Sequence, residues 1–262
     1  MGVLNVTPDS FSDGGRYADV ESAVARAKEM VAEGADLIDL GGETTRPGSL
    51  PVPAEEQIRR IEPVIRRIAS LPVLISVDTT RSAVAEAALD AGAAIVNDIS
   101  AGRDDPALLP LTGRRGCPVV LMHMQGTPAT MQDSPTYSDV VGEVAAFLKA
   151  RVAAAVEAGV ERGRILIDPG IGFGKTLEHN LTLLRRQRDW LEAVGLPAVI
   201  GTSRKGFIGK ITGVERPADR AFGTAATVAW AVANGAAVVR VHDVIAMKQV
   251  LVMTRALVDG EY

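Results

Sequence analysis

Eight short apolar runs rich in β-branched residues recur along the chain and constrain its fold more than any other feature. Most are continuously apolar instead of alternating, which is typical of parallel strands buried on both faces. The runs are Met1–Val6, Asp36–Gly41, Val73–Asp78, Ala94–Ile99, Val119–His123, Ile165–Asp168, Ala198–Thr202 and Ala237–Val241.

Helical patterns occupy the segments between these runs. Pro53 precedes an apolar stripe at spacings of 3, 4 and 3, formed by Ile58, Ile61, Ile65 and Ile68. A second stripe follows Ser138, the expected N-cap, and consists of Val141, Val144, Leu148, Val152 and Ala155. Glycines that end helices just before the next strand are expected at Gly34, Gly92, Gly159, Gly195 and Gly235.

Strand and helix therefore alternate eight times, which predicts an α/β fold, a single (β/α)8 TIM barrel. We find no linker, low-complexity tract or second domain, so residues 1–262 are expected to form one domain. A doubly wound open sheet is the alternative.

Composition excludes several classes of protein. The net charge of −4 gives no broad basic surface for nucleic acid or a membrane, and no apolar run is long enough for a transmembrane helix. The N-terminus lacks the basic region of a signal peptide. The single cysteine, Cys117, cannot form an internal disulfide and is expected to be buried and inert, so we expect a cytoplasmic protein.

The ends of the expected strands are strongly polar. In TIM barrels the working residues lie at the carboxyl ends of the strands, so these side chains should gather on one rim. They are Asn5, Glu43 to Arg46, Asp78, Asn97, Asp98, His123, Asp168, Ser203 to Lys205, Arg240, His242 and Asp243.

Arg240 and His242 are two residues apart and should face the same side of the eighth strand. A closed barrel brings that strand beside the first, and hence beside Asn5. Two anion donors next to an amide oxygen suit a phosphate group with bound Mg²⁺, for which one protein ligand can suffice. The alternative is a surface arginine with a packed histidine.

Asp78, Asn97, Asp168 and Lys205 form a second group. Two carboxylates and an amide could hold a flat heterocycle that offers adjacent N–H groups, such as an amino-pyrimidinone, while Lys205 donates to a ring carbonyl. A structural ion pair between Lys205 and an aspartate is an alternative. A Schiff-base lysine, as in barrel aldolases, is another.

Two other motifs are weak. Gly172 to Thr176 resembles the end of a phosphate-binding P-loop, but the first glycine of that pattern falls at Pro169. His123 lies between Met122 and Met124 and has no partner histidine at ligand spacing, so we expect it to anchor a loop.

Two polar segments, Thr7–Asp19 and Thr44–Val52, are expected to be lid loops. Each is rich in small polar residues. Phe11 is the one apolar residue in the polar core of the first, and a plain solvated connection is the alternative reading.

Eight motifs in register resemble the dihydropteroate synthase family from residue 2 to about residue 250. The first two run from Gly2 to Gly15 and from Gly41 to Gly48. The others, in order, are Ser76–Thr79, Asn97–Asp98, Met122–Met124, Asp168–Lys175, Ser203–Lys205 and Arg240–Asp243.

The resemblance implies a transferase of folate biosynthesis. Such an enzyme joins 4-aminobenzoate to 6-hydroxymethyl-7,8-dihydropterin diphosphate in an SN1-like reaction that releases diphosphate and gives 7,8-dihydropteroate. By resemblance, Asn5 binds Mg²⁺, Arg240 and His242 hold the diphosphate, and the pterin is held by Asp78, Asn97, Asp168 and Lys205. The aminobenzoate site is formed by Phe11, Thr45, Arg46, Pro47, Phe173 and Ser203. Asp78, Asp168, Lys205 and Arg46 are the expected catalytic residues, and a homodimer is implied.

The chain departs from the family pattern in two places. The second motif usually reads Glu-Ser-Thr and here reads Glu43-Thr44-Thr45; because threonine keeps the hydroxyl, we expect activity to survive. The family usually has residues ahead of the first strand, whose loss should affect stability more than activity. A pterin-binding methyltransferase domain and a non-catalytic pterin-binding module are the alternative functions, and the complete set of aminobenzoate-site residues disfavours the first.

Overall fold

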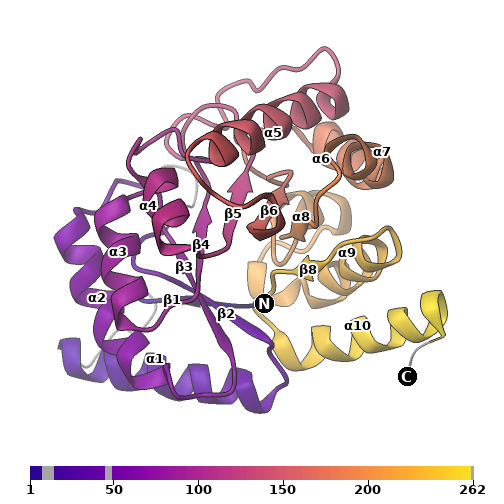
Figure 1. Cartoon of the computed structure of the whole chain (residues 1–262). Helices are drawn as coiled ribbons and strands as arrows, with labels where there is room; N and C mark the ends of the chain where they lie inside the picture. The colour runs from indigo at the N-terminus through magenta and orange to yellow at the C-terminus, as the bar shows by residue number, and fades with distance from the viewer. Residues whose placement is uncertain (8–14, 45–48, 261–262) are drawn as a thin grey trace.

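Eight parallel strands follow one another around a ring (Figure 1). The computed structural model describes residues 1–7, 15–44 and 49–260. Strands β1 to β6 form one sheet in chain order, and β7 pairs with β8. Single parallel bridges, Ile167 with Ala198 and Gly2 with Val241, join the two sheets at both edges. The predicted (β/α)8 barrel is thereby confirmed.

The strands are short, and only β6 has the predicted bounds; β7 and β8 are shortened the most, to two residues each. In the β7–β8 ladder, only two residues of each strand are paired. Ala198, just before β7, forms an isolated bridge with β6, and Val241, just after β8, forms one with β1. The bounds are β1 Gly2–Asn5, β2 Leu37–Gly41, β3 Leu74–Asp78, β4 Ile95–Asp98, β5 Val119–Met122, β6 Ile165–Asp168, β7 Val199–Ile200 and β8 Val238–Val239.

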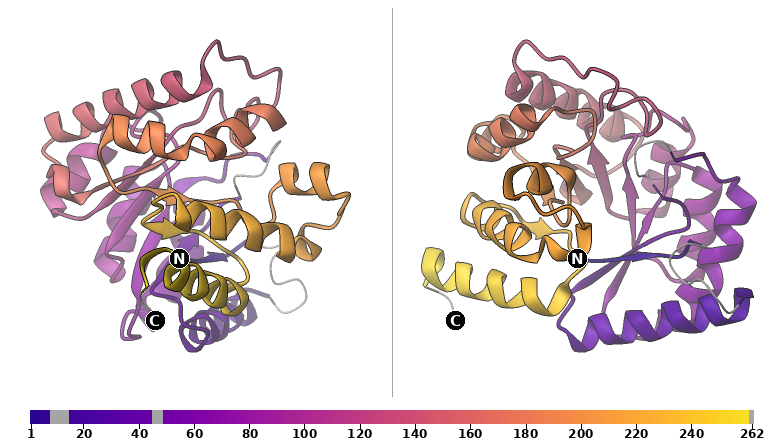
Figure 2. Two further views of the ribbon diagram at one scale, coloured as in Figure 1. Left: turned by 90° about the vertical axis from the view of Figure 1, so that its right-hand side faces the viewer. Right: turned by 180° about the vertical axis from the view of Figure 1, so that it is seen from behind.

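Helices surround the strands, as the three views in Figures 1 and 2 show. In the described parts of the chain, β6 and β7 are each followed by two helices, and each of the other six strands is followed by one. The bounds are α1 Gly15–Ala32, α2 Ala54–Ile68, α3 Ser82–Ala91, α4 Leu108–Arg115, α5 Val140–Glu157, α6 Leu177–Arg185, α7 Gln187–Val194, α8 Gly206–Thr212, α9 Ala221–Ala233 and α10 Val244–Asp259, with short 3-10 turns at Arg162–Arg164 and Pro217–Asp219.

The helix patterns read from the sequence hold in their main features. Within the α2 stripe Ile61, Ile65 and Ile68 are fully buried, and Pro53 is the N-cap. All five residues of the α5 stripe are buried. The five glycines expected to end helices all have positive φ, between 69° and 118°. At these positions the absence of a Cβ lets the chain turn into the next element.

Two details of the sequence prediction are wrong. The N-cap of α5 is Asp139 instead of Ser138, because the Glu143 carboxylate accepts the backbone N–H groups of both residues. The first predicted lid loop is also too long at its end, since Gly15–Asp19 already belongs to α1.

No described helix is long and apolar enough to cross a membrane. Cys117 is buried as expected, and burial raises the pKa of its thiol.

Candidate active site

A layer of apolar side chains fills part of the barrel interior, and it determines which residues point inward above it. Leu37, Ile95, Leu166 and Val238 belong to this layer. Side chains in a strand alternate between faces, so the residue two positions later points inward as well. Those residues are Asp39, Asn97, Asp168 and Arg240. The strand period therefore places charged and amide groups inside the barrel toward its carboxyl end.

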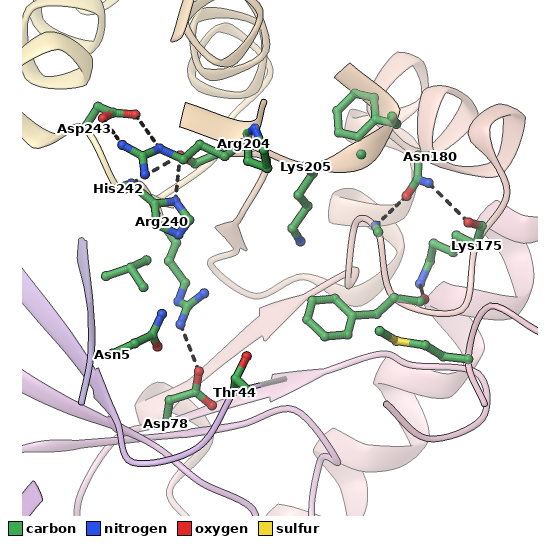
Figure 3. Close-up of a pocket in the computed structure, with 18 of the residues that line it drawn as sticks. Asn5, Thr44, Asp78, Lys175, Asn180, Arg204, Lys205, Arg240, His242 and Asp243 are labelled. Atoms are coloured by element: carbon green, nitrogen blue, oxygen red, sulfur yellow. Dashed lines mark hydrogen bonds and ion pairs between the residues drawn. The ribbon is translucent and has the colours of Figure 1, made fainter. Parts of the chain in front are cut away.

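Arg240 connects two carboxylates in this polar layer, and Figure 3 shows its contact with one of them, Asp78. Its Nε donates to Oδ2 of Asp39 at 2.6 Å and its terminal nitrogen donates to Oδ2 of Asp78 at 2.9 Å. Asp39 is fully buried and also accepts from Ser76 Oγ at 2.6 Å and Asn97 Nδ2 at 3.0 Å. The single positive charge of Arg240 thus partly neutralises the negative charges of Asp39 and Asp78.

Burial shifts the acidity of these groups. Desolvation, with help from the charge of Asp39, raises the pKa of Asp78 to about 7, although Arg240 opposes the shift. Desolvation also raises the pKa of Asp168, against the charge of Lys205 and a hydrogen bond from the Gly170 amide. Burial would lower the pKa of Arg240, but the charges of Asp39 and Asp78 outweigh it and raise it. Perturbed carboxylates grouped beside fixed cations are typical of functional sites.

Lys205 extends into the centre of the pocket from the start of α8 (Figure 3). Its ammonium donates to the carbonyl of Ile171 and lies 4.7 Å from the ring centroid of Phe173. Desolvation lowers the pKa of Lys205 to about 8, and Asp168 opposes this shift. The ammonium bonds to a carbonyl, so this geometry does not support the structural ion pair considered from the sequence.

The turn that carries Ser203 and Lys205 is strained and braced. Arg204 has a left-handed backbone, with φ of 61°, which is unfavourable for a residue with a Cβ. Its guanidinium forms a bidentate pair with Asp243, its N–H donates to Thr224 Oγ1, and its carbonyl accepts from Arg220. These contacts fix the side chains on both sides of Arg204.

Ser203 connects this turn to His242. The Ser203 hydroxyl oxygen accepts from the backbone N–H of His242 at 3.2 Å and lies 3.0 Å from its Nδ1. Burial, followed by the charges of Arg204 and Arg240, lowers the pKa of His242 to about 4, so the ring is neutral at pH 7. A hydroxyl proton directed at Nδ1 leaves the ring proton on Nε2, which is then a donor.

Asp78, Ser203, Lys205, Arg240 and His242 share one cavity of about 930 Å³. Its volume is in the range of small-molecule sites. Polar residues from the ends of several strands and the β7–α8 turn line it, together with the ring of Phe173. They include Asn5, Thr44, Asp78, Ser203, Lys205, Arg240 and His242.

Comparison with known proteins identifies the family. The profile of the family described as pterin binding enzyme matches residues 1–242. Dihydropteroate synthase from Synechocystis is 47% identical over 258 residues, covering 98% of this chain and 89% of the relative. The chain belongs to the dihydropteroate synthase family.

Solved structures of the family agree with the fold. Xanthomonas albilineans dihydropteroate synthase with 4-aminobenzoic acid superposes with a TM-score of 0.92 at 47% identity, covering 98% of this chain and 92% of that one. The same enzyme in complex with 7,8-dihydropteroate gives 0.89 at 44% identity, with the same coverage. The chain is therefore a transferase enzyme, as the sequence resemblance implied.

Most of the dihydropteroate synthase residues expected from the sequence lie together. Asn5, Asp78, Phe173, Ser203, Lys205, Arg240 and His242 line the cavity. Asn97 and Asp168 are more than nine-tenths buried just beside it: Asn97 is paired with Asp78 in the sheet register, and Asp168 is near enough for its charge to act on Lys205. Phe11, Thr45, Arg46 and Pro47 lie outside the described residues.

Several other rim residues have supporting contacts. Glu43 accepts from the Val52 amide and from Gln57, so it anchors the end of the second connection. His123 anchors a loop as expected, since its Nδ1 lies 2.9 Å from the buried ammonium of Lys175. That ammonium donates to the carbonyls of Gly170 and Phe173. Lys175 therefore stabilises this loop and does not have the role of a P-loop lysine that binds phosphate.

Sequence reasoning missed Asp39 and the roles of Arg204 and Asp243. The signal for Asp39 was present, because a charged residue stood in the middle of an apolar strand, Leu37–Gly41. Arg204 and Asp243 stood inside recognised motifs, but 39 residues separate them and nothing local indicates that they pair.

Proposed function

We propose that this chain condenses 4-aminobenzoate with 6-hydroxymethyl-7,8-dihydropterin diphosphate and releases diphosphate, as the family to which it belongs does. The single observation that carries the proposal is the shared cavity. Asp78 and Lys205, suited to a pterin ring, face the same space as Arg240 and His242, suited to an anion. The two ends of the first substrate can therefore be held at once, with its reactive methylene between them.

The residues support a reaction in which the leaving group departs first. The bond between the pterin methylene and the diphosphate oxygen breaks, and diphosphate leaves with the electron pair. The aromatic amine then attacks the methylene carbon and loses a proton. Ionised Asp78 and Asp168 would stabilise the positive charge that develops on the pterin. The Lys205 ammonium would donate to the ring carbonyl.

The diphosphate end of the cavity suits Mg²⁺. The Asn5 amide lines the cavity, and no described residue forms a hydrogen bond with it. Residue 41, between Asn5 and Asp78 in the register, is a glycine with no side chain. No group of three or more histidine, cysteine or acidic side chains that could hold a metal occurs in the described parts of the chain. This donor set fits Mg²⁺ that is held by Asn5, substrate oxygens and water, and the ion would neutralise charge on the leaving diphosphate.

The second substrate would bind near Phe173 and Ser203. Phe173 offers an aromatic face that already contacts Lys205, and the turn at Arg204 holds Ser203 in place. Phe11, Thr45, Arg46 and Pro47 are proposed to complete this end of the site.

Diphosphate release tests the function directly. Purified enzyme with Mg²⁺ and the pterin diphosphate should release diphosphate in repeated turnovers once 4-aminobenzoate is added, and 7,8-dihydropteroate should form in equal amount. Lys205→Met should lower the rate at least about a hundredfold, while the matched control Lys149→Met, on the exposed face of α5, should leave it unchanged. Binding of the pterin without diphosphate release would instead support a non-catalytic module, and methyl transfer would support the methyltransferase alternative.

We also propose that two copies associate through α9 and α10. Seven of the eleven large apolar side chains that are exposed in the described structure lie on these neighbouring helices, whereas monomers rarely expose such a concentration. Residues four apart lie on one face of a helix. On α9 such a row consists of Phe222, Ala226 and Trp230, and on α10 it consists of Ile245, Gln249, Met253 and Leu257. A twofold axis would bury this surface against itself.

The mass in solution tests the dimer. Light scattering coupled to gel filtration should give twice the chain mass of 27.5 kDa. Phe222→Glu together with Leu257→Glu should give monomers, and Val156→Glu, an exposed apolar position on α5, should not. A wild-type monomer at micromolar concentration would refute the proposal.

A further inference from the structure

Asp39 is a fully buried carboxylate on β2 that the proposed reaction does not use. Its side chain has no exposed surface. Ser76 from β3 donates to one oxygen, and Asn97 from β4 and Arg240 after β8 donate to the other. A buried carboxylate is costly unless it is paired and hydrogen-bonded, and here three elements of the barrel supply the donors.

These contacts fix the orientation of the Asn97 amide. An ionised carboxylate only accepts hydrogen bonds, so the amide NH₂ must face Asp39 and the amide oxygen must face away. Within the described residues, no donor is bonded to that oxygen. The Asn97 amide oxygen is therefore available to accept a hydrogen bond from a ring N–H of the ligand. A flipped amide would instead place its NH₂ against that N–H, and two donors cannot form a hydrogen bond.

The same carboxylate holds Arg240. Asp39 binds Nε, which leaves the far edge of the guanidinium to reach Asp78 at 2.9 Å. If residue 39 carried no charge, Asp78 would be the one charged partner left among these two contacts, and the Arg240 guanidinium could turn toward Asp78. Asp39 therefore acts on Asn97, at the pterin end of the site, and on Arg240, which connects Asp39 to Asp78 of that end.

We propose that Asp39 is a positioning residue for pterin recognition, which acts by setting the orientation of the Asn97 amide and the position of the Arg240 guanidinium. This inference rests on the proposed function of the site. It assigns Asp39 no contact with substrate. Its effect should therefore appear in pterin affinity and should become much smaller when Asn97 can no longer respond.

The test compares four variants by equilibrium binding of 6-hydroxymethyl-7,8-dihydropterin and by steady-state kinetics. Asp39→Asn keeps the shape but removes the charge, so the amide of Asn97 is no longer constrained. A ring N–H left without its acceptor should weaken pterin binding at least about tenfold. The KM for 4-aminobenzoate should stay within about twofold. Ser76→Ala removes a neutral donor from the same carboxylate and should change pterin affinity less than about threefold.

A double-mutant cycle separates positioning from general damage. In an Asn97→Ala background, Asp39→Asn should weaken pterin binding much less than it does in wild type, because the amide it orients is gone. Equal losses in the two backgrounds, or unchanged pterin affinity in Asp39→Asn, would overturn the inference. If wild type itself releases no diphosphate, the proposed function fails, and pterin binding still reports separately on Asp39.

A measurement on the wild type covers the case in which Asp39→Asn does not fold. The side-chain NH₂ of Asn97, assigned by nuclear magnetic resonance against Asn97→Ala, should exchange slowly with solvent both in the free enzyme and with pterin bound. Fast exchange, or loss of protection when pterin binds, would mean that the amide does not stay on Asp39 and would overturn the inference.

Discussion

Gly170 should tolerate no side chain, and the chain contains a matched position that isolates the reason. Gly170 has φ of 66°, and a Cβ there would overlap the carbonyl oxygen of His123. Gly195, at the end of α7, has φ of 69°, and nothing lies within 4 Å of a Cβ built there. Alanine at either residue suffers the same backbone strain, but only at Gly170 does it also meet a fixed backbone atom.

The magnitudes follow from these two costs. A left-handed backbone costs a residue with a Cβ about 1 kcal/mol or slightly more, so Gly195→Ala should lower the free energy of unfolding by about that amount. Forcing an extra methyl into a packed region costs about 1–3 kcal/mol in addition. His123 cannot easily yield, because its N–H donates to the carbonyl of Asp168 at 2.9 Å. Gly170→Ala should therefore cost about 3 kcal/mol.

Thermal unfolding followed by circular dichroism measures both variants. At about 2–4 °C per kcal/mol for a domain near this size, Tm should fall by about 2–4 °C in Gly195→Ala and by about 6–12 °C in Gly170→Ala. Well below both transitions, Gly170→Ala should also lose activity, since the displaced loop carries the Ile171 carbonyl that accepts from Lys205. Equal losses of Tm, or full activity in folded Gly170→Ala, would refute the reasoning.

Four further predictions concern ligands, pH and the chemistry of Lys205. Asn5→Ala should weaken Mg²⁺-dependent diphosphate binding about tenfold, and Arg240→Ala should weaken it more because a charge is lost; unchanged calorimetric affinity in both would remove the anion site from this end of the barrel. The pKa of Lys205 is lowered to about 8, so the ammonium is present below pH 8 and is lost above it, and kcat/KM should decline there. Lys205→Arg, if active, should keep its kcat/KM to higher pH. A decline at the same pH as in wild type would mean that another group causes the loss of activity above pH 8. Lys205 should also gain no mass when the reaction is quenched with borohydride, and a trapped adduct would restore the Schiff-base alternative. Finally, 4-aminobenzoate should bind the free enzyme poorly and more tightly once pterin, Mg²⁺ and diphosphate are present, because several residues assigned to its pocket lie on the connections after β1 and β2; equal affinity in both conditions would mean a preformed pocket.

The barrel was predictable because its signals are local. Most of the buried strands are continuous apolar runs, and in several places the helix that leads into a strand ends at a glycine. Gly92, for example, has φ of 118° between α3 and β4. The length of the last two strands was not predictable, since the pairing of Ala198 and Val241 depends on how the ring closes. Strand register across a closed sheet is a property of the whole barrel.

The rim of the site was predictable for a similar reason. A polar residue at the carboxyl end of a barrel strand lies near the site when its side chain points inward, so Asp78 and Asp168 could be selected one strand at a time. The partners of Arg240 could not. Its assignment to the diphosphate came from its spacing to His242, whereas its observed bonds reach Asp39 and Asp78 on the second and third strands.

Buried charge offers a way to find such residues before a structure exists. A strand packed on both faces excludes a charged side chain unless other elements supply its donors, because an unpaired buried carboxylate costs several kcal/mol. Asp39 interrupts the apolar run of Leu37, Ile38 and Leu40, so the sequence alone requires partners for it from neighbouring strands. The donors it recruits are Ser76, Asn97 and Arg240, and two of these three belong to the proposed substrate site. A lone charge inside a barrel strand therefore marks the layer of residues that supports a site, just as a polar residue at the strand end marks the layer that binds.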